Sequence, residues 1–251
     1  MVLRDHVSRL LPVAVKRRIR PLVAPLLQRL ERPRLERLCR AFVAAGDLVF
    51  DVGAAEGAHT AVFRALGARV VAEEPQPYCL EVLRRRFAAD DGVTVVAAGV
   101  ADRPGTLELH VSEGDPELST FDPNRGRVAR FAGSSWEGRV AVPVVTLDEL
   151  VRAHGEPDFV KVDVEGYEPR VCAGLVRSPR ALCFELNGEL LSDARECLAS
   201  LRRLGPIRCN ATLERRHRLV FPEWLGPEEL LARLQAMPSH GLHGDLFVRW
   251  G

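Results

Sequence analysis

From Gly46 onward, short apolar runs alternate with longer amphipathic segments, and this alternation constrains the fold more than any other feature of the sequence. The run "LVFDVG" enters a glycine turn, "AHTAVFRAL" has helical spacing, and "ARVVAEE" is a second apolar run. Strands that alternate with helices form βαβ units, whose strands lie parallel. We therefore predict an α/β fold of the Rossmann-like type, with a mainly parallel twisted sheet and helices on both faces.

The later segments extend this pattern and interrupt it once. "PYCLEVLRRRF" predicts a second helix, and "VTVVAAGV" predicts a third strand. "GTLELHV" and "RVAVPVV" predict an inserted hairpin, with the polar stretch 113–139 as a loop or lid over a site. A capping box in "TLDEL" begins a short helix, and strands follow at "DFVKVDVEG" and "RALCFEL". A helix that ends at Leu204, a strand near "IRCNAT", a helix in "GPEELLARLQAM" and a last strand in "GDLFVRW" complete a domain over 46–251.

Residues 1–45 differ from the rest of the chain and predict a helical N-terminal appendage. Leucines and valines recur at helical intervals among many arginines, while Pro12, Pro21, Pro25 and Pro33 break the run into short pieces. A basic amphipathic segment of this kind can also lie on a membrane surface. We expect it to pack against the main domain or against a second subunit of a homodimer, without membrane contact.

Charge and cysteine content limit the classes of partner and compartment. The formal net charge is +1, which gives no broad electrostatic basis for binding nucleic acid. The six cysteines are scattered, with no Cys-x-x-Cys pair, and no apolar run has the length of a signal peptide or of a transmembrane span. We expect a cytoplasmic protein with reduced thiols.

The glycine turn carries acids, which indicates the kind of cofactor it binds. The turn reads Asp51-Val-Gly53-Ala-Ala-Glu56-Gly57, and Glu74 follows the second predicted strand. A dinucleotide site prefers the spacing Gly-x-Gly-x-x-Gly, where a pyrophosphate meets a helix N-terminus. Acids repel phosphate but suit S-adenosylmethionine, which is cationic and has no phosphate. An NAD-dependent oxidoreductase and a non-catalytic scaffold remain as alternatives; the first lacks its glycine triplet, and the second is expected to have lost Asp51 or Glu74.

Six motifs resemble one known family. "FDVGAAEGAHT", "VVAEEPQP", "GVADRPGTLEL", "VTLDEL", "DFVKVDVEGYEPRVCAGL" and "CFELN" occur in the order and spacing of the FkbM-type S-adenosylmethionine-dependent methyltransferases, a branch of the class I fold. The resemblance covers about residues 46–190. It implies O-methylation of a hydroxyl on a small molecule, either a saccharide or a polyketide-type natural product.

The resemblance also assigns cofactor-binding residues. Glu74 and Pro75 match the "EP" motif that holds the ribose, and Gly99, Val100 and Asp102 match a segment beside the adenine. The sequence departs from the family where Ala55 replaces a common asparagine and Glu73 replaces a common aromatic residue. The predicted cofactor site comprises Asp51, Gly53, Ala55, Glu56, Gly57, Thr60, Glu74, Pro75, Gly99, Val100 and Asp102.

Methyl transfer to an alcohol requires a base or a metal, because the hydroxyl must lose its proton. Asp163 ends the fourth predicted strand, and Glu165 and Glu185 lie near it if the fourth and fifth strands are adjacent. These carboxylates can act as base, orient the hydroxyl, or hold Mg²⁺ or Mn²⁺ through Asp163 and Glu185. We expect Lys161 to pair with one of the acids, and His154 is an alternative base supplied by a loop.

Overall fold

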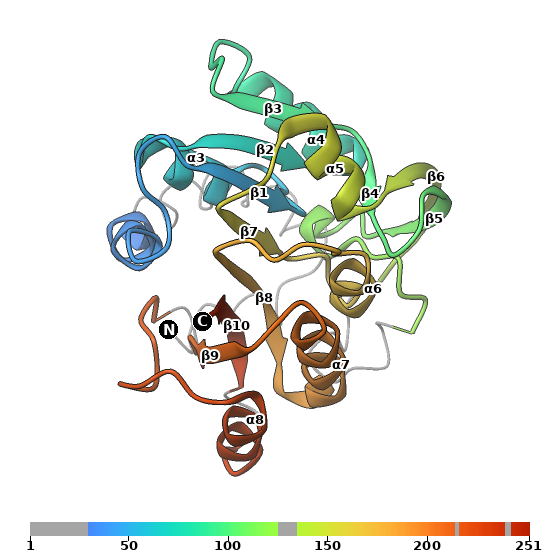
Figure 1. The fold of residues 1–251 in the computed structure, drawn as a ribbon. Coiled ribbons are helices and arrows are strands. Elements are labelled where there is room, and N and C mark those ends of the chain that lie inside the picture. The colour runs from blue at the N-terminus through green and yellow to red at the C-terminus, as the bar shows by residue number, and fades with distance from the viewer. Residues whose placement is uncertain (1–29, 125–134, 214–215, 239–241) are drawn as a thin grey trace.

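A seven-stranded sheet forms the centre of the protein in a computed structural model that describes residues 30–124, 135–213, 216–238 and 242–251. Its strand order is β3-β2-β1-β7-β8-β10-β9, and Figure 1 shows these strands stepping from the top of the view to the bottom. The strands are β1 Leu48–Val52, β2 Arg69–Glu73, β3 Val93–Val96, β7 Phe159–Val162, β8 Ala181–Asn187, β9 Ile207–Ala211 and β10 His243–Trp250. The predicted α/β class is confirmed.

The sheet is parallel except at β10, the last strand in the sequence. β1 pairs in parallel with β2 on one side and with β7 on the other, and β7 pairs in parallel with β8. β10 runs antiparallel to both β8 and β9. Because β1, β2, β7 and β8 all point the same way, their carboxyl ends meet at one edge of the sheet.

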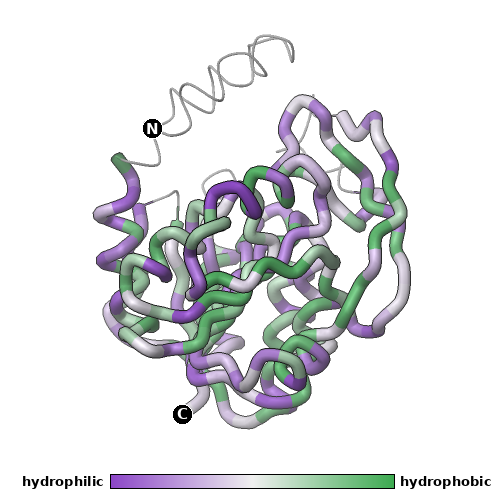
Figure 2. The backbone as a smooth tube through the Cα atoms, turned by 90° about the horizontal axis from the view of Figure 1, so that it is seen from above, coloured by the Kyte–Doolittle hydropathy of each residue, from purple (hydrophilic) through white to green (hydrophobic). Residues whose placement is uncertain are grey.

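Helices cover both faces of the sheet, as predicted. They are α3 Ala58–Ala65, α4 Pro77–Arg86, α5 Leu147–His154, α6 Glu168–Ala173, α7 Leu191–Arg202 and α8 Pro227–Gln235. One core cluster joins α5, α6, α7 and α8 to Phe50 and Val52 of β1, and the other joins α3 and α4 to Val49. This division follows from the alternation of side chains along a strand. Figure 2 shows hydrophobic, green segments through the middle of the molecule.

The predicted third strand is two strands that belong to different sheets. β3 ends at Val96, and β4 Gly99–Val100 pairs instead with β6 Gly138–Val145. β6 also pairs antiparallel with β5 Gly105–Val111, which confirms the predicted hairpin. A short 3-10 helix, η1 Pro116–Leu118, lies between β5 and β6. The apolar run is continuous in sequence, but the chain leaves the central sheet after Val96.

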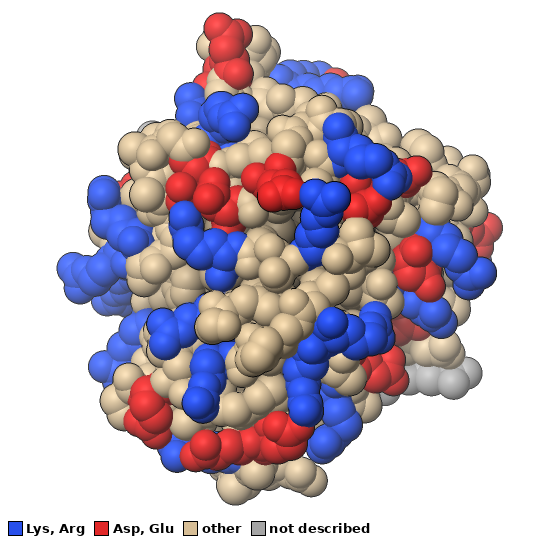
Figure 3. All heavy atoms as spheres, in the orientation of Figure 1, with Lys and Arg blue, Asp and Glu red and all other residues tan. Residues whose placement is uncertain are grey.

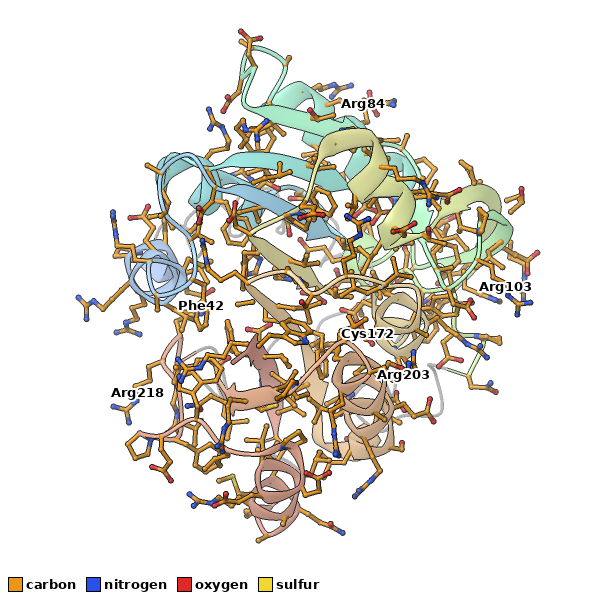
Figure 4. The ribbon with its side chains drawn as sticks, viewed as in Figure 1. Phe42, Arg84, Arg103, Cys172, Arg203 and Arg218 are labelled. Atoms are coloured by element: carbon orange, nitrogen blue, oxygen red, sulfur yellow. The ribbon has the colours of Figure 1, made fainter. Side chains whose placement is uncertain are left out.

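The end of the N-terminal segment packs into the core. A helix covers 30–39, and Leu38, Cys39, Phe42 and Val43 are buried in the same cluster as α3. The ring of Phe42 lies 4.7 Å from that of Phe247 and 5.6 Å from that of Phe159, and Figure 4 labels Phe42 beside this helix. Residues 1–29 lie outside the described residues, so the boundary at 45 and the role of the appendage remain predictions.

Several smaller predictions are confirmed. Thr146 and Glu149 form the capping box at the start of α5. All six cysteines are free and buried. Within the described ranges, no helix has the length and apolar character to cross a membrane. Basic and acidic side chains are interspersed over the face shown in Figure 3, in keeping with the small net charge.

Candidate active site

A pocket of about 440 Å³, measured out to its open mouth, lies at the carboxyl ends of β1, β2 and β7. Crevices at this edge are the usual ligand sites of open α/β sheets. The segment between β5 and β6 forms part of its wall. The pocket is lined by Gly53, Ala55, Glu73, Glu74, Pro75, Gln76, Gly99, Val100, Leu109, Pro116, Glu117, Ser119, Phe121, Asp163, Val164 and Glu165.

The glycine turn after β1 brings backbone close to the end of β7. Gly53 has φ 78°, and a Cβ atom there would lie 1.9 Å from the carbonyl oxygen of Asp163. Only glycine combines this backbone conformation with that approach. Ala55 also has a positive φ of 49°, and its N–H donates to Glu74 Oε2 at 2.7 Å. The turn is therefore shaped by contacts to both neighbouring strands.

Glu74 follows β2 and holds two turns together. Its carboxylate accepts from the N–H of Ala55 and from the N–H of Gln76, both at 2.7 Å, and the side chain is buried. Burial raises the pKa of this carboxyl to about 7, although the two N–H bonds lower it. Each oxygen keeps a lone pair that can accept a further hydrogen bond from a ligand in the pocket.

Glu73, the last residue of β2, is a second buried carboxyl beside Glu74. Its Oε2 accepts from the N–H of Gly53 at 3.2 Å, whereas its Oε1 has no hydrogen-bond partner among the described residues. Burial raises the pKa of Glu73 well above its usual value, and the charge of Glu74 raises it further. The neutral form of Glu73 is therefore favoured, next to the carboxyl that receives two short hydrogen bonds.

Beneath the turn, buried charges fix the strand ends. Asp51 is fully buried, and its Oδ2 accepts from Thr60 Oγ1 at 2.6 Å. Lys161 lies opposite Asp51 in the register of β1 and β7, and its Nζ donates to Asp163 Oδ2 at 2.7 Å. Burial lowers the pKa of Lys161, but the carboxylates of Asp163, Asp51 and Asp245 outweigh this and raise it. The predicted pairing of Lys161 with an acid of the site is confirmed.

Three carboxylates converge at the pocket's β7 side. One oxygen each from Asp163, Glu165 and Glu185 lies within 4.8 Å of the others, and all three side chains are half-buried. The sequence predicted this convergence if the fourth and fifth strands are adjacent. The parallel pairing of β7 with β8 meets that condition. Carboxylates so arranged can accept a proton, orient a hydroxyl, or bind a divalent cation.

The turn that carries Glu165 is held from two sides. Glu165 has φ 53°, a conformation that is uncommon for residues other than glycine. The buried carboxylate of Glu168 accepts from the N–H groups of Val164 and Gly166, each at 3.0 Å. From the opposite side, Thr120 Oγ1 donates to the carbonyl of Glu165 at 2.7 Å.

Some predicted site residues lie elsewhere. His154 ends α5, just before β7 begins, and the neighbouring Gly155 lies against Leu48 at the start of β1. It is therefore at the amino edge of the sheet, opposite the carboxylates, and the histidine-base alternative is corrected on that ground. Asp102 does not line the pocket and contacts Arg170 of α6 at 3.4 Å.

The remaining predicted cofactor residues support the turn and do not line the pocket. Gly57, with φ 78°, packs against Leu83 and Phe87 at the side of α4. The Glu56 carbonyl accepts from Arg86 Nη1 at 2.8 Å. Asp51 and Thr60 bind one another below the turn. Direct lining comes from Gly53, Ala55, Glu74, Pro75, Gly99 and Val100.

Comparison with known proteins gives these features a family. The model of the Methyltransferase FkbM domain matches residues 51–205, more than half of the chain, from the acid before the glycine turn to the end of α7. The chain belongs to the FkbM methyltransferase family. The sheet order and the pocket at its carboxyl edge fit the class I fold expected for FkbM proteins.

Three curated relatives are named as methyltransferases. Methyltransferase sdnD of Sordaria araneosa is 32% identical over 133 residues, covering 43% of this chain and 51% of that protein. Hexuronic acid methyltransferase AglP of Haloferax volcanii is 30% identical over 141 residues, covering 55% and 54%. 2-O-methyltransferase NoeI of Sinorhizobium fredii is 23% identical over 137 residues, covering 51% and 56%. The chain spans about half the length of the curated relatives it matches.

Several pocket and supporting residues of this FkbM chain were not assigned from the sequence. Glu168 stands in the quoted motif "DVEGYE", so an acid two residues after a glycine was the available signal. Glu73 was visible only as a departure from the family, and Gln76 adjoins the "EP" motif. Leu109, Pro116, Glu117, Ser119 and Phe121 reach the pocket through the inserted hairpin, and no local sequence signal marks them individually.

Proposed function

We propose that this FkbM chain is an S-adenosylmethionine-dependent O-methyltransferase that acts on a hydroxyl of a saccharide or polyketide-type small molecule. The observation that carries the proposal is the charge of the pocket wall. Its described lining includes five acidic residues, Glu73, Glu74, Glu117, Asp163 and Glu165, and neither lysine nor arginine. Burial favours the neutral form of Glu73, so the negative charge of the wall comes mainly from the other four. A cationic ligand without phosphate suits this wall, whereas a dinucleotide pyrophosphate is repelled by it.

The chain's own residues divide the work of binding. Glu74 accepts hydrogen bonds from the ribose hydroxyls, while Gly53 and Ala55 allow close approach at the turn. The small surface at Gly99 and Val100 accommodates the adenine. When bound, S-adenosylmethionine supplies an electrophilic methyl group for transfer to oxygen. Asp51 and Thr60 keep the turn in shape from below.

The carboxylates at the end of β7 serve the acceptor. Asp163, held by Lys161, takes up the proton of the substrate hydroxyl or orients that hydroxyl. Glu165 and Glu185 position the rest of the acceptor substrate. Transfer then forms an oxygen–carbon bond and breaks a carbon–sulfur bond, and the proton leaves with the carboxylate or through it to water. The relatives AglP, a hexuronic acid methyltransferase, and NoeI, a 2-O-methyltransferase, support a saccharide acceptor.

A divalent cation at the three carboxylates is the second form of this proposal. Three half-buried oxygens within 4.8 Å suit the oxygen preference of Mg²⁺ or Mn²⁺. The ion pair with Lys161 already satisfies part of Asp163, which favours direct contact with the hydroxyl over a metal. Both forms assign the acceptor to the same carboxylates.

Calorimetry tests the cofactor. We expect S-adenosylmethionine and S-adenosylhomocysteine to bind and NAD not to bind. Glu74→Ala is expected to weaken binding by about 1–3 kcal/mol, because the ribose loses a charged acceptor. Glu81→Ala, which removes an exposed glutamate of α4, is the matched control and should leave the affinity unchanged. Binding of NAD in preference to S-adenosylhomocysteine would favour the oxidoreductase alternative.

Asp163→Asn tests the acceptor side. Turnover is expected to fall by about 10²-fold or more while the affinity for S-adenosylhomocysteine changes little, since losses of a base or of positioning have that size. Loss of activity with EDTA that Mg²⁺ or Mn²⁺ restores assigns a metal to the carboxylates, and indifference to EDTA assigns direct contact. Near-normal turnover of Asp163→Asn contradicts the role of this carboxylate.

Compartment and assembly complete the proposal. Six buried free thiols support a cytoplasmic location, because disulfides are typical of oxidising compartments and none of these thiols is engaged in one. We also propose a homodimer in which the first 45 residues contribute contacts. Light scattering on the full chain measures the mass in solution, and a monomer would contradict the dimer.

A further inference from the structure

The segment between β5 and β6 touches two parts of the site at once. Pro116, Glu117, Ser119 and Phe121 line the pocket that we assign to the cofactor. Thr120 lies between the last two of these residues, is only 1% exposed, and points elsewhere. Its backbone is fixed by two hydrogen bonds with His110, at 2.9 and 3.0 Å. The segment thus presents alternate residues to the pocket and to a second contact.

That second contact is the turn of the acceptor carboxylates. Thr120 Oγ1 donates to the carbonyl of Glu165 at 2.7 Å and accepts from the N–H of Asp122 at 2.9 Å. Glu165 has the positive φ of 53°, so its carbonyl direction and its side-chain direction are set together by an uncommon backbone conformation. Fixing that carbonyl therefore fixes the backbone from which the Glu165 side chain extends toward Asp163.

Two other contacts make the connection stiff. Trp136 Nε1 donates to the carbonyl of Leu118 at 2.8 Å, which ties η1 to the chain just before β6. The ring of Phe121 lies 5.5 Å from the ring of Tyr167, which follows the Glu165 turn. A ligand that presses on the pocket wall can therefore transmit its effect to the turn through Thr120 and its neighbour.

Glu168 gives the turn its other support. Because its buried carboxylate accepts from the N–H groups of Val164 and Gly166, the amide groups on both sides of Glu165 are held from within the same motif. The carbonyl of Glu165 is left to a residue 45 positions away in the sequence. Of the two hydrogen-bonding supports, Glu168 and Thr120, Thr120 is the one that belongs to the segment whose neighbouring residues line the pocket.

We propose that Thr120 is a positioning residue that couples the pocket-lining residues between β5 and β6 to the Glu165 turn. Binding of the cofactor then fixes the position of the carboxylates that receive the acceptor hydroxyl. This inference rests on the proposed function. A single neutral hydrogen bond of this kind changes an equilibrium by about fivefold, which is enough to shift the turn between a fixed and a loose state.

The experiment compares Thr120→Val with Thr120→Ser by hydrogen–deuterium exchange and mass spectrometry, with S-adenosylhomocysteine as the probe. Valine keeps the shape of threonine and removes the hydroxyl, whereas serine keeps the hydroxyl. In the parent, the probe is expected to slow exchange in peptides covering 113–122 and 160–172. Thr120→Val is expected to bind within about threefold of the parent and to keep the slowing at 113–122.

The deciding peptide is 160–172. In this peptide, the slowing of exchange caused by the probe should be at least about fivefold smaller in Thr120→Val than in the parent. Thr120→Ser should restore the slowing. Equal slowing in Thr120→Val and in the parent overturns the coupling. Thr120→Ala replaces the valine variant if thermal unfolding shows that the latter is unfolded. A parent that does not bind the probe contradicts the proposed function itself, so the two failures are distinguishable.

Discussion

Glu73 and Glu74 are adjacent carboxyls in one buried wall, yet their hydrogen bonds give them different affinities for a proton. Glu74 accepts two N–H bonds at 2.7 Å, while Glu73 accepts one at 3.2 Å and leaves an oxygen without a partner among the described residues. Two like charges this close are not both stable when buried. The better-bonded Glu74 is therefore the more readily ionised of the two, and Glu73 is the more readily protonated.

Glu73→Gln tests this at the level of one residue. Folding raises the pKa of Glu73 above its ordinary value of 4.5. Above pH 4.5 the folded chain therefore keeps a proton that the unfolded chain releases. The free energy of unfolding consequently falls as the pH rises from 4.5 through the raised pKa. Glutamine keeps an acceptor for Gly53 and carries no charge. We expect the variant to be about 1–3 kcal/mol more stable than the parent at pH 8 and similar at pH 5, by urea unfolding. Parallel curves for the two proteins at both pH values would show that Glu73 is ordinarily ionised.

Residues at strand ends were the predictable part of the site. Gly53, Glu74 and Asp163 each follow an apolar run at a point where the fold places ligands, so position and residue type indicated them together. Thr120 and Phe121 have no such signal, because their role depends on where the inserted hairpin folds back. The protonation of Glu73 was also beyond the sequence, since it depends on which backbone N–H groups reach each oxygen.

Among the elements, the turn after β1 shows how one glycine links two strands. A Cβ on Gly53 would overlap the Asp163 carbonyl at 1.9 Å, and the residue also has φ 78°. The turn therefore packs directly against the backbone that follows β7. Sequence spacing indicated the glycine, but not the atom that it avoids.

Gly53→Ala is expected to destabilise the fold by about 2–4 kcal/mol and to abolish binding of S-adenosylhomocysteine, because both the clash and the backbone strain must be relieved by moving the turn. Gly46→Ala is the matched control. Gly46 has a similar φ of 89° but no atom within 4 Å of the added Cβ, so only strain of about 1–2 kcal/mol is expected. Thermal unfolding and calorimetry measure both variants. Equal losses in the two would mean that backbone strain alone matters at Gly53.

The strand pattern was predictable for the central sheet and failed where a strand changed partner. The run over 93–100 is apolar apart from Thr94, yet Val96 ends its pairing with β2 and Gly99 begins pairing with β6. Periodicity reports which residues are buried but not which strand they lie against. The pairing of β6 with both β4 and β5 depends on the hairpin's return, which is a long-range event.

At the scale of the whole molecule, the core extends beyond the domain boundary that composition suggests. Phe42 packs among Phe159, Phe247 and Trp224, and the Phe42 carbonyl accepts from Arg180 Nη2 at 2.7 Å. These contacts join the chain before β1 to β7, β10 and the loop before α8. The change in composition at Gly46 marks where the α/β alternation begins, and the packed core begins several residues earlier.

Two truncations separate these boundaries. A chain that starts at residue 30 is expected to fold and to bind S-adenosylhomocysteine, because it keeps the helix over 30–39 and Phe42. A chain that starts at residue 46 should be destabilised by more than the roughly 3–5 kcal/mol lost when a buried Phe is removed. Circular dichroism during heating and calorimetry measure both. Full stability of the shorter chain would place all of 1–45 outside the domain.

The position of β10 has a consequence for the order in which the protein is made. β10 is the last strand of the described chain, but it lies inside the sheet, between β8 and β9. While the chain is being synthesised, β3, β2, β1, β7 and β8 can pair as they emerge, whereas β9 has no neighbour until residues 243–250 follow. During that interval β8 presents an open edge, which is the kind of surface on which incomplete chains associate with one another. Pairing of residues 243–250 is therefore what closes this part of the sheet, and a chain cut short before β10 is expected to aggregate.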